Sequence, residues 1–233
     1  MMSGTSLDGI DISLVKTNGI DLIRLDKNFY HRYDHKTRNY LLNTLQEDIN
    51  INLEKQEYIG KIITNEHIKA LKNLNIVQKC DLIGFHGQTI YHNPNTQTSI
   101  QLGNPKNLAN TFQKKIIFNF RSKDIEFGGQ GAPLAPIYHK YIIENLKLNK
   151  PSCMLNIGGV ANLTFWDGNT LIGFDTGPGN ALMDNYSRLI SNNYFDINGE
   201  IASQGLANKK IIEKFMKNDF FQMAPPKSLD RNT

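Results

Sequence analysis

The sequence contains few cysteines and no long apolar run. Its two cysteines, Cys80 and Cys153, lie far apart with no metal-ligand spacing. We therefore expect neither a disulfide framework nor a cysteine metal site, which fits a reducing compartment. No apolar stretch approaches the length that spans a bilayer, and the first residues resemble no secretion signal. These absences predict a cytoplasmic protein with no membrane partner.

The chain also lacks a strong charge bias. Its formal net charge is +4, and the lysines are scattered along the sequence. A nucleic-acid-binding protein would concentrate them in a stripe with aromatic residues, so we expect no nucleic-acid partner. The composition, 39% hydrophobic and 21% charged over 233 residues, is typical of a globular protein with one large domain or two modest lobes.

Predicted strands alternate with predicted helices, which indicates an α/β protein. The run 10–15 alternates apolar and polar residues and leads to a hairpin signal at Asn18-Gly19. Apolar residues with helical spacing predict helices over about 53–74, 107–113 and 181–191. Further strands are predicted at 82–85, 99–102, 116–118, 153–157, 160–165 and 170–175. Each half carries a glycine-turned hairpin, which suggests an ancient duplication.

Four connecting segments carry their own expectations. Residues 86–89 read as a polar turn after a strand, and residues 120–133 as a long loop whose glycines cannot lie inside a helix. Pro133 then opens a helix that runs to about residue 148. The segment 176–180 breaks the preceding strand, and the tail from Gly205 holds one more helix.

The stretch from Gly4 to Asp11 is the most informative candidate site. Small residues let a backbone approach a ligand closely, and successive N–H groups can hold phosphate oxygens. The two carboxylates, Asp8 and Asp11, could hold Mg²⁺ through water. The alternative is a tight hairpin turn with polar decoration, and the stretch is not a P-loop because no lysine follows its second glycine. The cofactor-binding candidates are Gly4, Thr5, Ser6, Leu7, Asp8, Gly9, Ile10 and Asp11.

A second glycine turn lies in the other half. Asn156, Gly158 and Gly159 belong to a plain β-hairpin if taken alone. Paired with the first stretch, the turn could hold a polyphosphate from the opposite side of a cleft, with backbone amides and Mg²⁺ neutralising its charge.

Asp175 follows an apolar strand, where α/β sheets bind their ligands. A carboxylate there suits a general base that deprotonates an attacking hydroxyl or water. The alternatives are a cap for the next helix or a Mg²⁺ ligand.

Arg121 and Asp124 could bind a sugar or a carboxylate, with a surface salt bridge as the alternative. His86 and His92 have no metal-ligand spacing on a helix, and each is more typical of a turn or hydrogen-bonding histidine than of a catalyst. We count His86 with Arg121 and Asp124 as the substrate-binding candidates.

Five short motifs occur in order over nearly the whole chain, and together they are highly specific. They are Met2-Ser3-Gly4-Thr5-Ser6-Leu7-Asp8-Gly9, Gly84-Phe85-His86-Gly87-Gln88-Thr89, Gly128-Gly129-Gln130-Gly131-Ala132-Pro133-Leu134, Asn156-Ile157-Gly158-Gly159 and Phe174-Asp175-Thr176-Gly177-Pro178-Gly179-Asn180. The set resembles the anhydro-N-acetylmuramic acid kinase family.

That resemblance implies an actin/hexokinase-like (ribonuclease H-like) fold of two lobes closing over ATP and Mg²⁺, and a homodimer. It implies a reaction in which water opens the 1,6-anhydro ring of the sugar while O6 takes the γ-phosphate of ATP, in cell-wall recycling. The segment from Gly4 to Asp11 would bind the ATP phosphates, and Asp175 would be the base. Arg121 would contact the lactyl carboxylate of the sugar.

The sequence departs from the family pattern at both ends. Relatives begin with most of a strand before the first motif and continue well beyond Pro225-Pro226-Lys227-Ser228. We therefore expect a first lobe over 1–118 and an incomplete second lobe over 119–233. A kinase that lacks part of its second lobe is expected to be poorly active or inactive. The rival functions are another sugar phosphotransferase or ATPase of this fold and a non-catalytic remnant.

Overall fold

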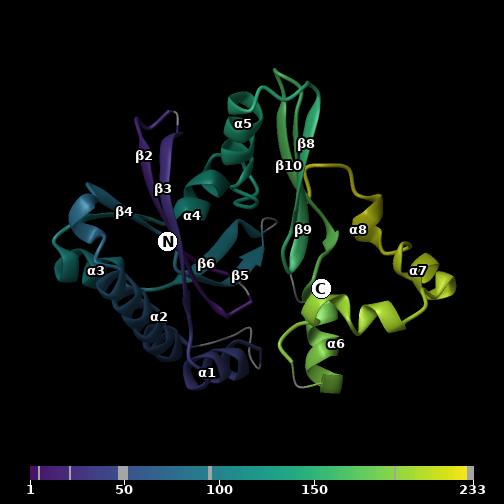
Figure 1. Cartoon of the computed structure of the whole chain (residues 1–233), viewed down its shortest axis with the longest axis horizontal. Helices are drawn as coiled ribbons and strands as arrows, with labels where there is room; N and C mark the ends of the chain where they lie inside the picture. The colour runs from purple at the N-terminus through teal and green to yellow at the C-terminus, as the bar shows by residue number, and fades with distance from the viewer. Residues whose placement is uncertain (5, 21, 47–51, 94–95, 192, 230–233) are drawn as a thin grey trace. The chain divides into compact units, whose positions relative to one another are not determined.

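The computed structural model of the chain describes residues 1–4, 6–20, 22–46, 52–93, 96–191 and 193–229. These residues form two compact units, Met1–Gly131 and Ala132–Thr233, and each contains both strands and helices (Figure 1). The fold class is therefore mixed α/β, as the alternation of predicted elements indicated. Each unit is described by itself below.

The first unit is built on a five-stranded mixed sheet with the order β3-β2-β1-β5-β6. Strand β1 runs antiparallel to β2 and parallel to β5, whereas β2–β3 and β5–β6 are antiparallel pairs. A separate parallel pair joins β4 to β7. The strands are β1 (Met2–Ser3), β2 (Gly9–Thr17), β3 (Leu22–Arg32), β4 (Leu82–Phe85), β5 (Gln88–Asn93), β6 (Thr98–Leu102) and β7 (Lys115–Phe118).

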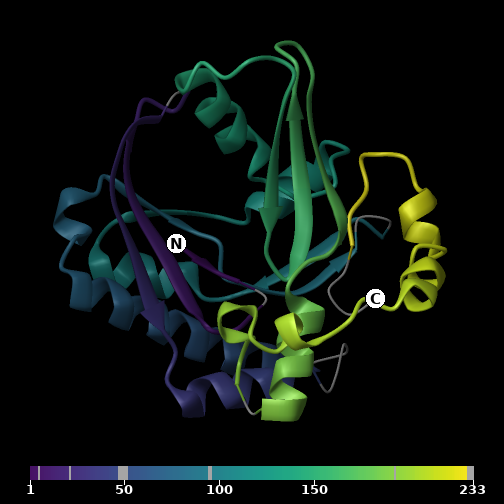
Figure 2. The same cartoon turned by 45° about the vertical axis from the view of Figure 1, so that its right-hand side comes forward.

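The long helix α2 (Leu53–Leu74) supplies much of the core of this unit. Its apolar residues recur every three or four positions and therefore share one face, on which Ile59 and Ile63 are fully buried. Asn52 caps the helix by accepting from the Lys55 N–H at 2.9 Å. Figures 1 and 2 show α2 beside α3, and α2 also contacts β6. The other helices are α1 (His35–Gln46), the 3₁₀ helix η1 (Val77–Lys79), α3 (Pro105–Phe112) and α4 (Phe120–Glu126).

The second unit is built on a three-stranded antiparallel sheet with the order β10-β9-β8. Helix α5 packs on β9 and β10. At Gly173 a Cβ atom would lie 2.2 Å from the Pro136 ring, so the close approach of helix and sheet requires glycine. The elements are α5 (Pro136–Asn145), β8 (Ser152–Ile157), β9 (Val160–Trp166), β10 (Leu171–Pro178), α6 (Ala181–Ser191), η3 (Ile197–Gly199), η4 (Ala202–Gln204), α7 (Lys209–Phe215) and α8 (Asp219–Gln222).

The two units share one arrangement of strands. In each, three consecutive antiparallel strands lie side by side, β1-β2-β3 in the first and β8-β9-β10 in the second, and a helix follows, α1 or α6. In each, the first two strands are joined by a glycine-containing turn. This repetition supports the duplication suggested by the sequence.

Several predicted elements are confirmed, and others are wrong at identifiable positions. The predicted strand 10–15 and the helices 53–74 and 181–191 all form. Residues 120–126 form helix α4 and not a loop, because the glycines begin only at Gly128 and leave a seven-residue stretch without glycine or proline. The glycine-rich segment that follows is indeed not helical.

Four boundaries also differ from the prediction. Helix α5 begins at Pro136 and not at Pro133, with Pro136 in the first turn where its missing N–H is tolerated. Gln88 begins strand β5 instead of extending the turn, because it pairs with Leu102. Strand β10 continues to Pro178 because a bulge absorbs the irregularity. The tail forms two short helices, α7 and α8, rather than one.

The boundary between the compact units follows Gly131, whereas the predicted lobes divide after residue 118. Helix α4 packs on β6 of the first unit, which accounts for the difference. Within the described part of the chain, no helix is both long and apolar enough to cross a membrane.

Buried Thr64 links α2 to the start of α3, and replacing it tests this packing. Its hydroxyl donates to the Gly60 carbonyl at 2.6 Å and accepts from the Asn104 N–H at 2.7 Å. Thr64→Val should cost about 1–3 kcal/mol in urea unfolding, because the Asn104 N–H loses its buried acceptor. The exposed Thr111→Val is the control and should change stability by less than about 0.5 kcal/mol. Equal unfolding midpoints for the two variants would contradict this account.

Candidate functional site

The loop between β1 and β2 closes as a tight turn. The Leu7 N–H donates to the Gly4 carbonyl at 3.1 Å, and Leu7 adopts a positive φ of 52°. The Leu7 side chain is buried in the apolar core. The Asp8 carbonyl accepts from the Tyr33 N–H at 3.0 Å. The loop is thus fixed at two points, and Thr5, one of its predicted ligand-binding residues, lies outside the described residues.

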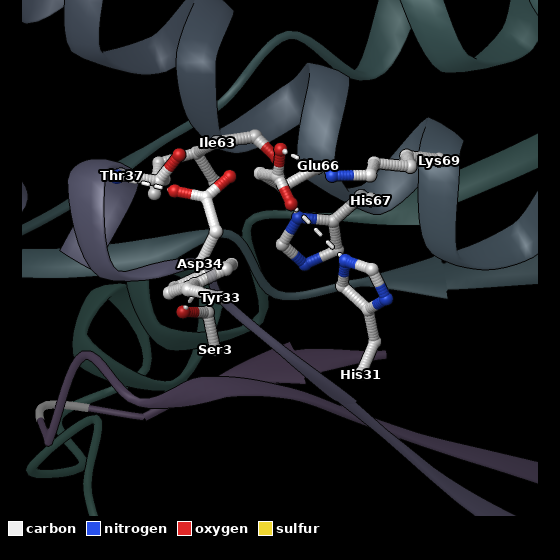
Figure 3. Close-up of polar contacts among 9 residues, drawn as sticks. All are labelled: Ser3, His31, Tyr33, Asp34, Thr37, Ile63, Glu66, His67 and Lys69. Atoms are coloured by element: carbon white, nitrogen blue, oxygen red, sulfur yellow. Dashed lines mark hydrogen bonds and ion pairs between the residues drawn. The ribbon is translucent and has the colours of Figure 1, made fainter.

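Arg38 on helix α1 binds the loop from the interior. Its Nε donates to the Leu7 carbonyl at 3.0 Å and its Nη2 to the Ser6 carbonyl at 3.4 Å, while the side chain is only 7% exposed. Asp34 accepts from the Thr37 N–H at 2.7 Å and so caps the first turn of α1, the helix that carries Arg38 (Figure 3). The cap and the buried cation together hold the loop backbone in place.

A buried polar network holds the residue just before the loop. The Ser3 hydroxyl bonds the Tyr33 hydroxyl at 2.8 Å and donates to Gln88 Oε1 at 2.6 Å. Burial raises the pKa of Tyr33 well above its ordinary value, so Tyr33 stays neutral. Figure 3 also shows His31 of β3 pointing at Glu66 of α2, with 3.0 Å between His31 Nε2 and the carboxylate. These bonds fix β1 and β3 around the loop.

Asp8 and Asp11 form an acidic pair at the other end of the loop. Burial, and then the Asp8 carboxylate, raise the pKa of Asp11. Burial and the Asp8 carboxylate, which accepts a hydrogen bond from the Tyr30 hydroxyl, raise the pKa of Tyr30 to about 12. The described residues contain no group of three His, Cys, Asp or Glu side chains that could hold a metal ion. Two carboxylates nevertheless suit Mg²⁺, which keeps several of its waters.

The glycines of the two turns are of two kinds: at some the fold has no room for a side chain, and at others a Cβ atom would fit. A Cβ at Gly9 would lie 2.4 Å from the His31 carbonyl oxygen, so the fold itself requires this glycine. At Gly4 no described atom lies within 4 Å of that position, and at Gly158 and Gly159 the nearest atoms lie at 3.4 and 3.8 Å. None of the three has a positive φ. Packing among the described residues therefore does not explain these glycines, and their role in binding a ligand stays a prediction.

The second turn, Gly158-Gly159, is fastened to the start of α6. The Asn180 N–H donates to the Gly158 carbonyl at 2.7 Å, and the Gly179 N–H donates to the Gly159 carbonyl at 2.9 Å. The Asn180 side chain adds a bond to the Ile157 carbonyl at 3.1 Å. These bonds hold the turn by its carbonyl oxygens.

Three polar side chains line up across the second sheet. Asn162 of β9 is the register partner both of Asn156 on β8 and of Asp175 on β10. Residues directly opposite one another in antiparallel strands point to the same face, so the three form a row. Asn156 lies just before the glycine turn. The register therefore places this residue near the turn on the same face of the sheet as Asp175.

Asp175 is buried and bound to the tail of the chain. Its N–H donates to the Lys227 carbonyl at 2.9 Å, and its Oδ2 accepts from the Leu229 N–H at 2.8 Å. The expected position at the end of the strand is wrong, since β10 continues to Pro178 and Asp175 lies at its bulge. The helix-cap alternative is not supported, because α6 begins only at Ala181. A bulge re-aims a side chain, which suits a functional carboxylate.

His86 and Arg121, two predicted substrate-binding residues, are in direct contact. Arg121 Nε donates to His86 Nε2 at 2.9 Å, and His86 Nδ1 donates to the Gly87 carbonyl at 2.9 Å. Arg121 Nη1 also donates to the Gly131 carbonyl at 3.1 Å. Burial, with a contribution from Arg121, lowers the pKa of His86 to about 4. His86 is therefore neutral near pH 7 and orients the guanidinium as an acceptor.

Asp124 lies one turn further along α4 and supports the adjoining glycine loop. Its Oδ2 accepts from the Gly131 N–H at 2.7 Å, and its carbonyl accepts from the Gly129 N–H at 2.9 Å. A Cβ at Gly129 would lie 2.2 Å from the carboxylate, so the loop wraps closely around it. Asp124 thus has a structural role, and a contact with substrate stays a prediction.

Two residues that contribute to the candidate site are missing from the sequence predictions. Arg38 carries no motif, and only its contact with the loop reveals it. Asn162 lies three residues after the second glycine motif, but its significance depends on which residue of β10 it faces. The first unit groups its predicted residues around the loop and around Arg121, and the second groups Asn156, Gly158 and Gly159 with Asp175.

Alanine at the two glycines of the first loop should separate their roles. Gly9→Ala should lower the free energy of unfolding by about 1–3 kcal/mol, because the new methyl group collides with a backbone carbonyl. Gly4→Ala should stay within about 0.5 kcal/mol of the parent. Urea unfolding of the two variants is the measurement. A destabilised Gly4→Ala would show that packing, and not ligand approach, requires that glycine.

The neutral His86 should make stability depend on pH. Its folded-state pKa of about 4 lies below the value of about 6.5 for an unfolded histidine. The unfolded chain therefore takes up the proton first, and stability falls as the pH drops from about 6.5 to 4. Between pH 7 and pH 5, His86→Gln should lose less stability than the parent, by about 1–2 kcal/mol. An identical loss in both proteins would mean that His86 is charged in the fold.

The sequence is similar to one protein family over its whole length. The profile of the family described as "Anhydro-N-acetylmuramic acid kinase" matches residues 1–233. A relative with that name from Bradyrhizobium diazoefficiens is 38% identical over 243 aligned positions, which cover 100% of this chain and 66% of the relative.

Two further relatives carry the same name. The one from Nitrobacter winogradskyi is 37% identical and aligns with 100% of this chain and 66% of its own length. The one from Pelagibacter ubique is 38% identical and aligns with 94% of this chain and 61% of its own length. The chain thus spans about two thirds of the length of the curated relatives it matches. It belongs to the anhydro-N-acetylmuramic acid kinase family.

Proposed function

We propose that the chain acts as an ATP-dependent kinase on anhydro-N-acetylmuramic acid. Water would open the 1,6-anhydro ring while O6 is phosphorylated, giving N-acetylmuramic acid 6-phosphate for cell-wall recycling. Family membership and the names of the relatives support the reaction and the sugar. When bound, ATP with Mg²⁺ supplies the phosphoryl group.

The observation that carries the proposal is the position of the Asp175 carboxylate. It is buried at a bulge of β10, in a row with Asn162 and Asn156 that extends to the residues around the Gly158-Gly159 turn. The Leu229 N–H fixes its Oδ2. A carboxylate held in this way is suited to take a proton from the attacking water.

The first unit offers the groups expected to bind the phosphates. The backbone around Gly4 is open to close approach, and Arg38 with Leu7 holds the loop from the interior. Asp8 and Asp11 would hold hydrated Mg²⁺ at the end of the loop.

Arg121 is the proposed partner of the lactyl carboxylate of the sugar. Its bonds to His86 Nε2 and the Gly131 carbonyl hold the guanidinium in one orientation. A guanidinium fixed in one plane favours bidentate binding of a carboxylate. His86 would act through Arg121, and Asp124 through the loop it holds.

Within the mixed α/β class, the repeated three-strand arrangement supports an actin/hexokinase-like fold. Two related units, each with a glycine turn between its first two strands, are what the predicted pair of phosphate-binding turns requires. The homodimer expected from the family stays a prediction.

Asp175→Asn tests the assignment of the base. The asparagine keeps an acceptor for the Leu229 N–H but cannot take the proton, so the phosphorylation rate should fall by about 10²–10⁴-fold with ATP binding retained. The measurement is formation of sugar phosphate from anhydro-N-acetylmuramic acid and ATP-Mg²⁺, together with calorimetric titration of the nucleotide. Asp167→Asn is the control, because Asp167 also accepts backbone N–H bonds in a hairpin of the same sheet.

Three outcomes would count against the proposal. Near-normal turnover by Asp175→Asn would show that Asp175 is not the general base. Equal turnover of simple hexoses by the parent chain would favour another sugar kinase of this fold. Absence of both sugar phosphate and sugar binding would favour a non-catalytic remnant.

A further inference from the structure

Asn162 carries a buried hydrogen-bonding atom that the fold leaves unused. Its Oδ1 is inaccessible to solvent and has no hydrogen-bond donor among the described residues. Buried polar side chains are generally hydrogen-bonded, and an acceptor without a donor destabilises the fold. An asparagine at such a position therefore points to a donor that arrives with a ligand.

The strand register shows where that donor would lie. Asn162, Thr164 and Trp166 alternate along β9 and so share one face of the sheet. Helix α5 covers the latter two, since His139 bonds Thr164 at 2.7 Å and Glu144 bonds Trp166 at 2.6 Å. Asn162 is the next residue of this face towards the glycine turn.

Asp175 is the neighbour that Asn162 faces. The two residues are directly opposite in the β9–β10 ladder, where Cβ atoms are separated by about 5 Å. One water molecule can bridge an amide oxygen and a carboxylate on two such opposite residues, by donating one O–H to each. Such a water would satisfy Asn162 Oδ1 and place a proton at Asp175.

We propose that Asn162 is a catalytic residue that holds the attacking water against Asp175. This rests on the proposed function. The water oxygen bonds to C1 of the sugar as the C1–O6 bond breaks, and O6 takes the phosphoryl group of ATP, leaving ADP. One proton of the water passes to Asp175. The other stays on the new C1 hydroxyl, and Asn162 Oδ1 accepts its hydrogen bond during the attack.

The repeated architecture supports a ligand-facing role for this position. In the second unit Ile157 pairs with Ala161 beside the turn, and the next pair is Asn156 with Asn162. In the first unit Ser3 pairs with Ile10, and the next pair is Met2 with Asp11. Asn162 thus occupies the register position that Asp11, a candidate Mg²⁺ ligand, holds in the first unit. Both polar residues follow a glycine turn on the second strand of the meander.

Asn162→Leu is the central test, because leucine matches the volume and lacks the acceptor. Its kcat with anhydro-N-acetylmuramic acid and ATP-Mg²⁺ should fall by about 10²-fold, with KM for the sugar nearly unchanged, since the water loses its orientation. Its urea midpoint should equal or exceed that of the parent, since an unused buried acceptor has been removed. Asn169→Leu, in the exposed β9–β10 turn, is the control and should leave both quantities unchanged.

Asn162→Asp gives a readout that a structural role would not move. The new carboxylate keeps an acceptor for the water but adds a like charge beside Asp175. It should therefore retain more turnover than the leucine variant, with the acid limb of its pH–rate profile displaced to higher pH.

The outcomes separate this inference from the function on which it rests. An Asn162→Leu variant with kcat within about threefold of the parent, or one that unfolds at lower urea, overturns the role of Asn162 and leaves the kinase assignment intact. A parent chain that forms no sugar phosphate overturns the proposed function and the inference with it.

Discussion

The pairing of β9 with β10 is the constraint on which the candidate site of the second unit depends. Opposite residues share a face, so this register alone places Asn162 beside Asp175. A slip of one residue would turn either side chain to the opposite face of the sheet. The packing of α5 opposes such a slip, because Trp166, Thr164 and Gly173 must all face the helix for its hydrogen bonds and close approach to form. Packing of α5 at one end of the sheet therefore fixes the positions of Asn162 and Asp175 at the other end.

The two glycine turns are held by different means, although the strands around them repeat. In the first unit a buried apolar residue, Leu7, and the cation of Arg38 bind the loop from the interior. In the second unit the N–H groups of Gly179, Asn180 and Ala181, just before and at the start of α6, bind the carbonyl oxygens of the Gly158-Gly159 turn. Both arrangements fix the backbone without placing a side chain at the glycines where a Cβ atom would fit. Preorganised backbone groups bind a charged ligand with little further ordering, which is the physical requirement for recognising a polyphosphate.

Much of the fold could be predicted from the sequence, because its longer elements have strong local patterns. Helix α2 has an apolar stripe and a capping asparagine, and β2 alternates up to its Asn-Gly turn. Helix α4 was not predicted, because its seven residues are too few for a clear helical pattern and the glycines that follow indicated a loop. The sequence motifs include Gly4 and Asp175, and Arg121 was predicted from the segment 120–133, but Arg38 and Asn162 become significant only through contacts and register between distant segments. No local pattern encodes such contacts, so the sequence alone could not reveal them.

The contact between His86 and Arg121 shows how one partly buried residue can orient another. A protonated His86 would repel the guanidinium and could no longer accept its hydrogen bond, so the contact requires the neutral imidazole. Burial lowers the pKa of His86 to about 4 and keeps it neutral near pH 7, while its Nδ1–H is committed to the Gly87 carbonyl. The tautomer is thereby fixed, with Nε2 turned to Arg121 as an uncharged acceptor. Asp124 holds the loop whose Gly131 carbonyl is the second acceptor of Arg121. His86 and Asp124 therefore both help to orient the Arg121 guanidinium.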